Sequence, residues 1–471
     1  MPDAIAGLAR EAIPAPTGEA MIGARLDELG VSWRLWALIC LISLGGVFEF
    51  YDLMMTAYVS PGLIRSGLFR LGRAGLFGQS DQASFASATF VGLFIGTLGF
   101  SRAADRFGRR SVFTFALISY ALATLIMATR QTAAGVDLWR LISGIGMGVE
   151  LVTIDAYVSE LAPARLRGRA FALNQAIQFS AVPIVAALSW KLIPLAPLGV
   201  PGWRWVMGIG AVGALAVWAI RKRLPESPRW LARNGRLVEA DLIVSRLEGR
   251  APSPPESLRL AEAAIAERPE GRLSEAFAPL YRRRTLMLVA FNIAQAIGFY
   301  GFGNWAPSLI AAQGHSVTDG LAYSAAIAIA FPFSPLICAA LADRFERKHL
   351  IMSAALITAV TGLAFSGQSA QGPIIVLGVV LTASNNLLSF AYHAYQAELY
   401  PTRIRAKAVG FVYSWSRLAT IASSYIIAAL LTDIGSPGVF AFIAGAMAVV
   451  VVSVGLFGPR TLGLALERTS N

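Results

Sequence analysis

Two acidic residues, Glu49 and Asp52, lie within the apolar stretch GVFEFYDLMM. In a helix, a spacing of three places both side chains on one face. Two close carboxylates in a medium of low dielectric constant raise each other's affinity for protons. We therefore expect one of them to take up and release a proton near neutral pH. The alternative is that the pair has only a structural role in an ion pair.

Further ionisable side chains occur in other apolar stretches, namely Arg140, Glu150, Asp155, His393 and Arg417. The guanidinium group of Arg417 does not usefully deprotonate, so it needs an anion where it is buried. A protein carboxylate or a bound small molecule can supply that anion, unless the side chain snorkels to the membrane surface. The sequence leaves these three alternatives open.

The elements that carry these residues are predicted to be membrane-spanning helices. The chain has 471 residues, of which 56% are hydrophobic and 14% charged, whereas soluble proteins are about 25% charged. This composition excludes an ordinary soluble enzyme. A spanning helix needs about 20 apolar residues, and such stretches cover residues 34–58, 84–103, 111–130, 137–160, 169–192, 203–221, 285–312, 320–342, 349–368, 373–397, 405–432 and 437–458. These runs are longer than the strands of a membrane barrel, which favours an all-α membrane protein.

The basic residues gather in alternate loops of this arrangement. By the positive-inside rule those loops face the cytoplasm, and both termini are then expected there as well. The net charge of +12 is accordingly explained by topology, and we expect no nucleic-acid partner. No apolar core precedes Trp33, so no cleavable signal peptide is predicted. Cys40 and Cys338 fall inside apolar spans, which argues against a disulfide or a zinc site.

The chain contains an internal repeat. The loop AADRFGRR recurs as LADRFERK, and the segment YVSELAPARLRGRA recurs as YQAELYPTRIRAKA, both at an offset of 238 residues. Two matches at one offset indicate parallel repeats, as in transporters that rock around a central site. We therefore predict a cytoplasmic tail over 1–33, a six-helix bundle over 34–221, a cytoplasmic linker with short helices over 222–284, a second bundle over 285–458, and a cytoplasmic tail over 459–471.

These motifs resemble the major facilitator superfamily over essentially the whole chain. The loop DRFGRR after the second span is similar to the cytoplasmic gate loop of that superfamily, although Ser101 and Glu346 stand where glycine is usual. The segments beginning at Arg140 (RLISGIGMG) and at Pro225 (PESPRW) are similar to the branch that contains sugar porters, organic ion carriers and metabolite:proton symporters. The resemblance implies two pseudo-symmetric six-helix bundles and transport by alternating access.

For the loops, the resemblance implies a charged network that closes the cytoplasmic side. Carboxylates there can accept bonds from arginine side chains and helix starts, which would favour the outward-facing state. The purely topological role of positive charge is the alternative. The candidate gate residues are Asp105, Arg106, Arg109, Arg110, Glu160, Arg167, Asp343, Arg344, Glu398 and Arg405.

For proton coupling, the resemblance points to one pair of residues. In sugar porters an aspartate of the first span and an arginine of the fourth form a proton-linked pair, and Asp52 and Arg140 match these positions. Glu150 and Asp155 lie deeper in the fourth span, and Asp155 is related by the repeat to His393. A relay through these residues is possible, but a spacing of five places Glu150 and Asp155 on different helix faces.

For the substrate, two readings remain. Arg417 stands where organic anion, organic cation and nicotinate-type carriers have an arginine, which favours a substrate carboxylate. Gln175 and Gln295 match sugar-binding glutamines of sugar porters, but Tyr300 and Tyr392 depart from the sugar motifs. Many of these polar groups can simply bond across helices. The candidate binding residues are Gln175, Gln178, Gln295, Tyr300, Asn304, Trp305, Tyr392, His393 and Arg417.

The sequence thus predicts a proton-coupled importer of a small metabolite bearing a carboxylate, with a sugar:proton symporter as the alternative. It predicts a multi-pass protein of the bacterial inner membrane, acting as a monomer. The carboxylates and the membrane histidine are dispersed without a nucleophile or metal-binding constellation, so no enzyme activity, cofactor or metal is expected.

Overall fold

The computed structural model describes residues 18–70, 72, 78–221, 224–254, 272–342 and 344–461. Its elements are helical throughout this part of the chain. The N-terminal half contains α2 (Trp33–Arg65), α3 (Asp81–Phe107), α4 (Arg109–Ala128), α5 (Ala133–Leu161), α6 (Arg167–Phe179), α7 (Ala181–Leu192) and α8 (Gly202–Arg221). The C-terminal half contains α12 (Pro279–Gly303), α13 (Ala306–Ala311), α14 (Val317–Ala328), α15 (Ala330–Ala342), α16 (Arg347–Ser366), α17 (Gln371–Glu398), α18 (Thr402–Asp433) and α19 (Ser436–Phe457).

Three predicted spans are each divided into two helical segments, and a proline explains each division. A proline ring clashes with the carbonyl group four residues earlier and removes a hydrogen bond. Pro183, Pro307 and Pro332 lie four residues after the last residues of α6, α12 and α14. Each segment pair therefore remains one span with a break inside it.

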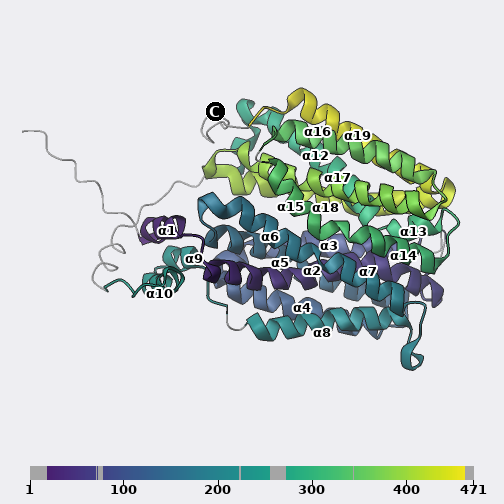
Figure 1. Cartoon of the computed structure of the whole chain (residues 1–471), viewed down its shortest axis with the longest axis horizontal. Helices are drawn as coiled ribbons and strands as arrows, with labels where there is room; N and C mark the ends of the chain where they lie inside the picture. The colour runs from purple at the N-terminus through teal and green to yellow at the C-terminus, as the bar shows by residue number, and fades with distance from the viewer. Residues whose placement is uncertain are drawn as a thin grey trace, which may run out of the picture.

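Eleven spans in the described residues are long and apolar enough to cross a membrane. The remaining span, α8, packs against α2 and α4 and completes the first group of six. The twelve spans form two bundles that lie side by side in Figure 1, the N-terminal one in purple to teal and the C-terminal one in green to yellow. The bundles meet where α3 contacts α18, α6 contacts α15 and α7 contacts α14.

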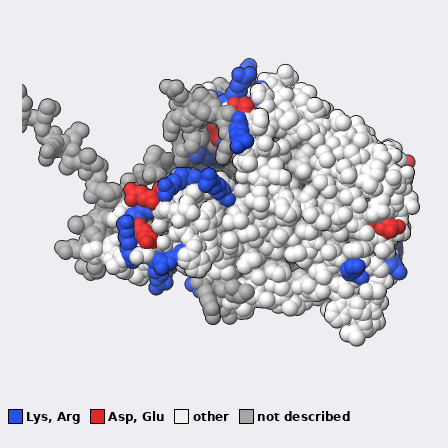
Figure 2. All heavy atoms as spheres, viewed as in Figure 1, with Lys and Arg blue, Asp and Glu red and all other residues white. Residues whose placement is uncertain are grey.

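Three helices stand outside the two bundles at one end of the molecule. They are α1 (Gly18–Glu28), α9 (Pro228–Arg233) and α10 (Leu237–Glu248), and they share an apolar cluster that includes Ile22, Trp230 and Val244. Lys and Arg gather at this end in Figure 2, whereas the long side wall shows no charged groups. We call it the basic end. The helix α1 lies within the predicted tail, and α10 lies where helix-forming residues were expected in the linker.

Glycine allows α3 and α5 to pack closely. A Cβ atom at Gly96 of α3 would overlap the carbonyl oxygen of Ile145, and one at Gly92 would lie 2.7 Å from the Cα atom of Gly144. Small residues allow such close contact between membrane helices. By contrast, a Cβ atom at Gly99 of the same helix would meet nothing within 4 Å.

We expect Gly96→Ala to destabilise the protein by about 1–3 kcal/mol, because the new methyl group forces the backbones of α3 and α5 apart. The matched change Gly99→Ala should leave stability unchanged or raise it slightly, since alanine favours a helix. Thermal unfolding of both purified variants in detergent measures the difference. Equal melting temperatures would show that close contact at Gly96 is unimportant.

Candidate functional site

A buried ion pair joins α2 to α5 inside the N-terminal bundle. The Nη1 atom of Arg140 lies 2.9 Å from Oδ2 of Asp52, and the two side chains are 0% and 5% exposed. Hydroxyl groups complete the pair. Thr124 and Ser143 donate to the carboxylate at 3.0 and 2.7 Å, and Arg140 Nε donates to Thr89 at 2.8 Å.

This arrangement satisfies both charges away from water. A second nitrogen of Arg140 donates to the backbone carbonyl of Asp52 at 2.6 Å and to the hydroxyl group of Thr56. Sequence reasoning missed all four hydroxyl residues. Thr56 follows Asp52 by four residues and Ser143 follows Arg140 by three, so helical spacing alone places both beside the pair.

The two carboxylates of α2 serve different partners. Glu49 is 1% exposed, and its charge acts on Arg417 and Tyr413 of α18 in the opposite bundle. Asp52, one turn further along, is held by Arg140 within its own bundle. A single helix therefore connects the buried ion pair with the space between the two bundles.

Arg417 lies at the middle of α18 and is 2% exposed. Its guanidinium donates to the phenol oxygens of Tyr300 at 3.0 Å and Tyr413 at 3.2 Å, with the ring of Tyr413 5.0 Å away. In the part of the chain that the structure describes, no carboxylate oxygen lies within 4.0 Å of this group. Sequence reasoning missed Tyr413, although it precedes Arg417 by one helical turn.

Asp155 and His393 border the same region from the side of the basic end. Both are exposed, although each lies on a helix of the transmembrane bundles. The ring of His393 is 5.6 Å from that of Tyr413, and the charge of Asp155 also acts on Tyr413. The described structure thus gathers Glu49, Asp155, His393, Tyr413 and Arg417 around one region, which we call the central site.

The other candidate residues are not among the five that form the central site. Gln178 donates to Asn174 at 3.0 Å and packs against α2 where Gly46 leaves room for it. Tyr392 is fully buried and stacks on Phe291 with ring centroids 4.0 Å apart, inside the C-terminal bundle. The remaining candidates are buried or half-buried side chains, namely Glu150, Gln175, Gln295, Asn304 and Trp305.

Hydrogen bonds join the two bundles in the half remote from the basic end. Gln82 of α3 donates to Ser308 of α13 at 3.0 Å, and Ser87 donates to the carbonyl group of Ile421 at 3.2 Å. Phe90 of α3 contacts Tyr300 edge to face at 4.6 Å. These contacts join the two bundles on the remote side of Arg417, and the exposed groups of the central site lie on the other side.

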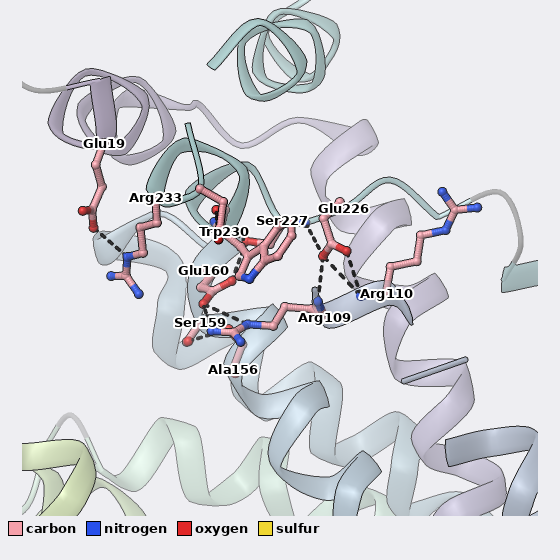
Figure 3. Close-up of polar contacts among 11 residues, drawn as sticks. Glu19, Arg109, Arg110, Ala156, Ser159, Glu160, Glu226, Ser227, Trp230 and Arg233 are labelled. Atoms are coloured by element: carbon pink, nitrogen blue, oxygen red, sulfur yellow. Dashed lines mark hydrogen bonds and ion pairs between the residues drawn. The ribbon is translucent and has the colours of Figure 1, made fainter. Parts of the chain in front are cut away.

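Near the basic end, a charged network organises the N-terminal half (Figure 3). Arg109 of α4 pairs with Glu160 of α5 at 2.9 Å, and Ser227, which begins α9, donates to the same carboxylate. Glu226 accepts the backbone N–H groups of Arg109 and Arg110 at 3.0 and 3.2 Å. Burial raises the pKa of Glu226, and these N–H groups oppose the rise. We call these residues the N-half network.

Gly108 makes room for this network. Its backbone φ of 92° favours glycine, and a Cβ atom there would collide with the carboxylate of Glu226. In the other half, the position related by 238 residues is Glu346, with a φ of −58°. The carboxylate of Glu346 accepts the N–H group of Thr461 at 3.0 Å. In each half, a glutamate therefore joins the segment after the sixth span to the loop after the second span. In the N-terminal half the glutamate belongs to the segment after the sixth span, and in the C-terminal half it belongs to the loop.

The contacts of Glu346, Arg347, Tyr395 and Glu398 form a similar network in the other half, which we call the C-half network. Arg347 pairs with Glu398 at 3.1 Å, at positions related by 238 to Arg109 and Glu160. Tyr395 donates to the carbonyl group of Pro459 at 2.8 Å, as Tyr157 does to that of Pro225. The repeat seen in the sequence is thus also a repeat of contacts.

The other predicted gate residues lie outside the two ion pairs of these networks or outside the described residues. Arg405 donates to the carbonyl group of Tyr400 at 3.2 Å, Arg106 lies over the ring of Phe107, and Arg344 is exposed. Arg167 is half-buried. Asp343 and the side chain of Asp105 lie outside the described residues, so their gate role stays a prediction.

Comparisons with known proteins identify the family. The sequence profile described as sugar (and other) transporter matches residues 38–471. YyaJ of Bacillus subtilis, named for metabolite transport, is 29% identical over 447 residues, covering 93% of this chain and 95% of the relative. The niacin transporter NiaP of Acinetobacter baylyi is 26% identical over 444 residues, covering 94% and 98%.

Among solved structures, the xylose transporter XylE of E. coli, in a partially occluded inward-open conformation, superposes with a TM-score of 0.75 at 19% identity. The match covers 92% of this chain and all of that one. The chain belongs to the sugar (and other) transporter family of the major facilitator superfamily. It is a multi-pass membrane transporter and not an enzyme.

We expect Glu160→Gln to cost more stability than Glu398→Gln. Both changes remove one charge and keep the size of the side chain, but the Arg109–Glu160 side chains are only 7% and 11% exposed, against 20% and 19% for Arg347–Glu398. Breaking a buried pair costs about 3 kcal/mol, and a more solvated one costs about 1 kcal/mol. Thermal unfolding in detergent tests this order, and an inverted order would refute it.

Proposed function

We propose that this protein imports a small metabolite bearing a carboxylate, driven by protons, across the bacterial inner membrane. The basic end would face the cytoplasm, in keeping with the positive-inside rule. The two bundles would rock about their mutual contacts, and the protein would act as a monomer. The N-half and C-half networks, which each join residues of one half only, would hold the cytoplasmic helix ends of their own bundle together as the bundles rock.

The observation that carries this proposal is the set of groups that surround the buried guanidinium of Arg417. The guanidinium is buried at mid-depth, yet within the described residues its only hydrogen-bond partners are two neutral phenols. A buried cation is stable only with a compensating anion. The charge of Glu49 acts on Arg417 electrostatically. A substrate carboxylate can therefore complete the site through both terminal nitrogens of the guanidinium.

Similar proteins support both substrate classes. NiaP is named for niacin, which is an aromatic carboxylate. XylE is named for xylose, and the family description names sugars first. A sugar:proton symporter is therefore the second candidate, with Gln175 and Gln295 as its expected ligands. Tyr300 and Tyr413 around Arg417 favour an aromatic or planar acid, because flat rings stack on such surfaces.

The chemistry of coupling follows from the Asp52–Arg140 pair. Protonation of Asp52 removes the negative charge and leaves Arg140 to its hydroxyl and carbonyl partners. The pair then no longer fixes α2 to α5 by charge. Because α2 also carries Glu49 beside Arg417, a shift of this helix alters the field at the central site. Proton binding and substrate binding are thereby linked through one helix.

Asp52→Asn should abolish accumulation of substrate against its gradient, because the amide cannot exchange a proton. Substrate exchange across the membrane should continue, because the neutral side chain still accepts and donates hydrogen bonds. Uptake by reconstituted vesicles with and without an imposed pH gradient measures both. Asp319→Asn, a change at an exposed aspartate of α14, is the matched control. Retention of uphill, pH-dependent uptake by Asp52→Asn would exclude Asp52 as the coupling site.

Arg417→Ala should weaken binding of an acid at least about a hundredfold, because it removes a charged contact in a desolvated site. Arg417→Lys should retain part of the affinity, since it keeps the charge but loses the planar fork. Pyridine-3-carboxylate and its amide form a matched probe pair, measured by isothermal titration. The amide never used the charge, so its affinity should change little.

A sugar site predicts the opposite pattern. Gln175→Ala and Gln295→Ala would then cause the greatest loss of xylose binding, and Arg417 would matter only for folding. Size-exclusion profiles and melting temperatures establish that each variant is folded. Undiminished acid binding by a folded Arg417→Ala protein would remove the carboxylate proposal and leave the sugar proposal.

A further inference from the structure

Arginine side chains line a cleft near the basic end. Two adjoining cavities of about 430 and 450 Å³ lie between α4, the segment after α8, and α10, and they share Arg110, Pro225, Ile243 and Arg246. We call them together the basic cleft. Its arginines are Arg34, Arg110, Arg236 and Arg246. The side chain of Arg110 points away from the Arg109–Glu160 pair in Figure 3.

The two carboxylates that line the cleft are already bonded. Glu226 accepts backbone N–H groups of α4, and Glu239 pairs with Arg236 at 2.7 Å. Arg34 and Arg246 are exposed, and no carboxylate oxygen of the described residues lies within 4.0 Å of either. Positive charge is therefore in excess in the cleft, and an anion is its complementary ligand.

An apolar groove continues from the cleft along the membrane face of the protein. It has a volume of about 490 Å³, lies between α4 and α5, and shares Phe107 and Ser111 with the cleft. Its walls are the side chains of Val112, Phe115, Ala116, Ile145 and Val149 together with Gly146, and Ser119 and Ile142 lie at the remote end. Phe115 is 71% exposed on this face.

The groove extends over most of one leaflet of a bilayer. From Ser111 to Ser119, α4 advances about 12 Å at 1.5 Å per residue. Half of the hydrocarbon core is about 15 Å. Gly146 lets α4 and α5 pack closely beside the groove, because a Cβ atom there would lie 2.7 Å from the hydroxyl oxygen of Ser119.

We propose that the basic cleft and the apolar groove together bind one anionic phospholipid. The phosphate would contact Arg110, Arg236 and Arg246, which line one cavity of the cleft, and an acyl chain would lie in the groove between α4 and α5. Basic pockets beside membrane helices recognise anionic headgroups in this way. A free phosphate would have no use for the groove, and a zwitterionic lipid would not match the surplus of positive charge. Because Arg110 and Glu226 belong to both sites, the bound lipid would touch the N-half network.

Thermal unfolding of the full-length protein in detergent, titrated with dioleoyl phosphatidylglycerol, tests the proposal. The lipid should raise the melting temperature of the wild type. In the double variant Arg236→Gln/Arg246→Gln, the half-maximal lipid concentration should rise about thirtyfold, since each arginine near an anionic headgroup contributes about a fivefold gain in affinity. The matched control Arg233→Gln/Arg250→Gln removes two exposed arginines that do not line the cleft, and it should behave as the wild type.

The groove is tested separately. Ser111→Trp places a ring where groove and cleft meet, and it should weaken lipid binding without removing any charge. Leu122→Trp, at a position of α4 that is 47% exposed and outside the groove, is its control. If Ser111→Trp and Leu122→Trp bind the lipid equally, the groove holds no acyl chain.

Two ligand controls decide the nature of the site. Dioleoyl phosphatidylcholine should stabilise the protein much less than phosphatidylglycerol, and equal stabilisation would mean that the lipid charge is not recognised. Glycerol phosphate at the same concentration should have no effect, and an equal effect would reduce the site to a pocket for free phosphate. Equal losses in the two double arginine variants would reduce it to general attraction of charge.

Discussion

A charge inside an apolar interior is stable only when another charge or several hydrogen bonds compensate for it. This constraint decides where the polar groups of this transporter lie. The Asp52–Arg140 pair meets it completely, with four hydroxyl groups and a backbone carbonyl around two charges. Arg417 meets it only with two phenols and the more distant field of Glu49. The ion pair is thus complete in the absence of substrate, whereas the proposed function has an additional anion complete the site at Arg417.

The internal repeat distinguishes residues that have a counterpart of the same type in the other half from residues that have none. Arg109 and Glu160 have counterparts in Arg347 and Glu398, and the two tyrosine contacts to proline carbonyl groups are repeated as well. By contrast, the counterparts of Asp52, Arg140 and Arg417 are Ala290, Gly378 and Phe179. The symmetric residues hold helix ends in both halves. Asp52 and Arg140 lie in the N-terminal bundle and Arg417 lies in the C-terminal bundle, so the proposed coupling pair and the proposed anion site belong to different bundles.

The two networks near the basic end make the same kind of contact with different residues: in each, a glutamate carboxylate accepts a backbone N–H group. In the N-terminal half, Gly108 leaves space for Glu226, which arrives from the segment after α8. In the C-terminal half, Glu346 occupies the place of Gly108 and supplies the carboxylate itself. The carboxylate acceptor can belong to either of the two segments in contact, provided that the facing segment leaves space for it. Substitutions at such paired positions are therefore coupled across large sequence distances.

The sequence alone determined the class of protein, the twelve spans and the repeat, because each depends on local hydropathy or on residue identity at a constant offset. The profile match and the structure agree with these predictions. The sequence also placed Asp52 opposite Arg140, but only through resemblance to a family. The tertiary structure decided what spacing cannot. It showed that Asp52 pairs with Arg140, whereas the charge of Glu49 acts on residues of the opposite bundle. It also placed Tyr413 beside Arg417 and Tyr392 within the C-terminal bundle. Helical spacing fixes the face of one helix, whereas the partner across that face depends on how the bundles pack.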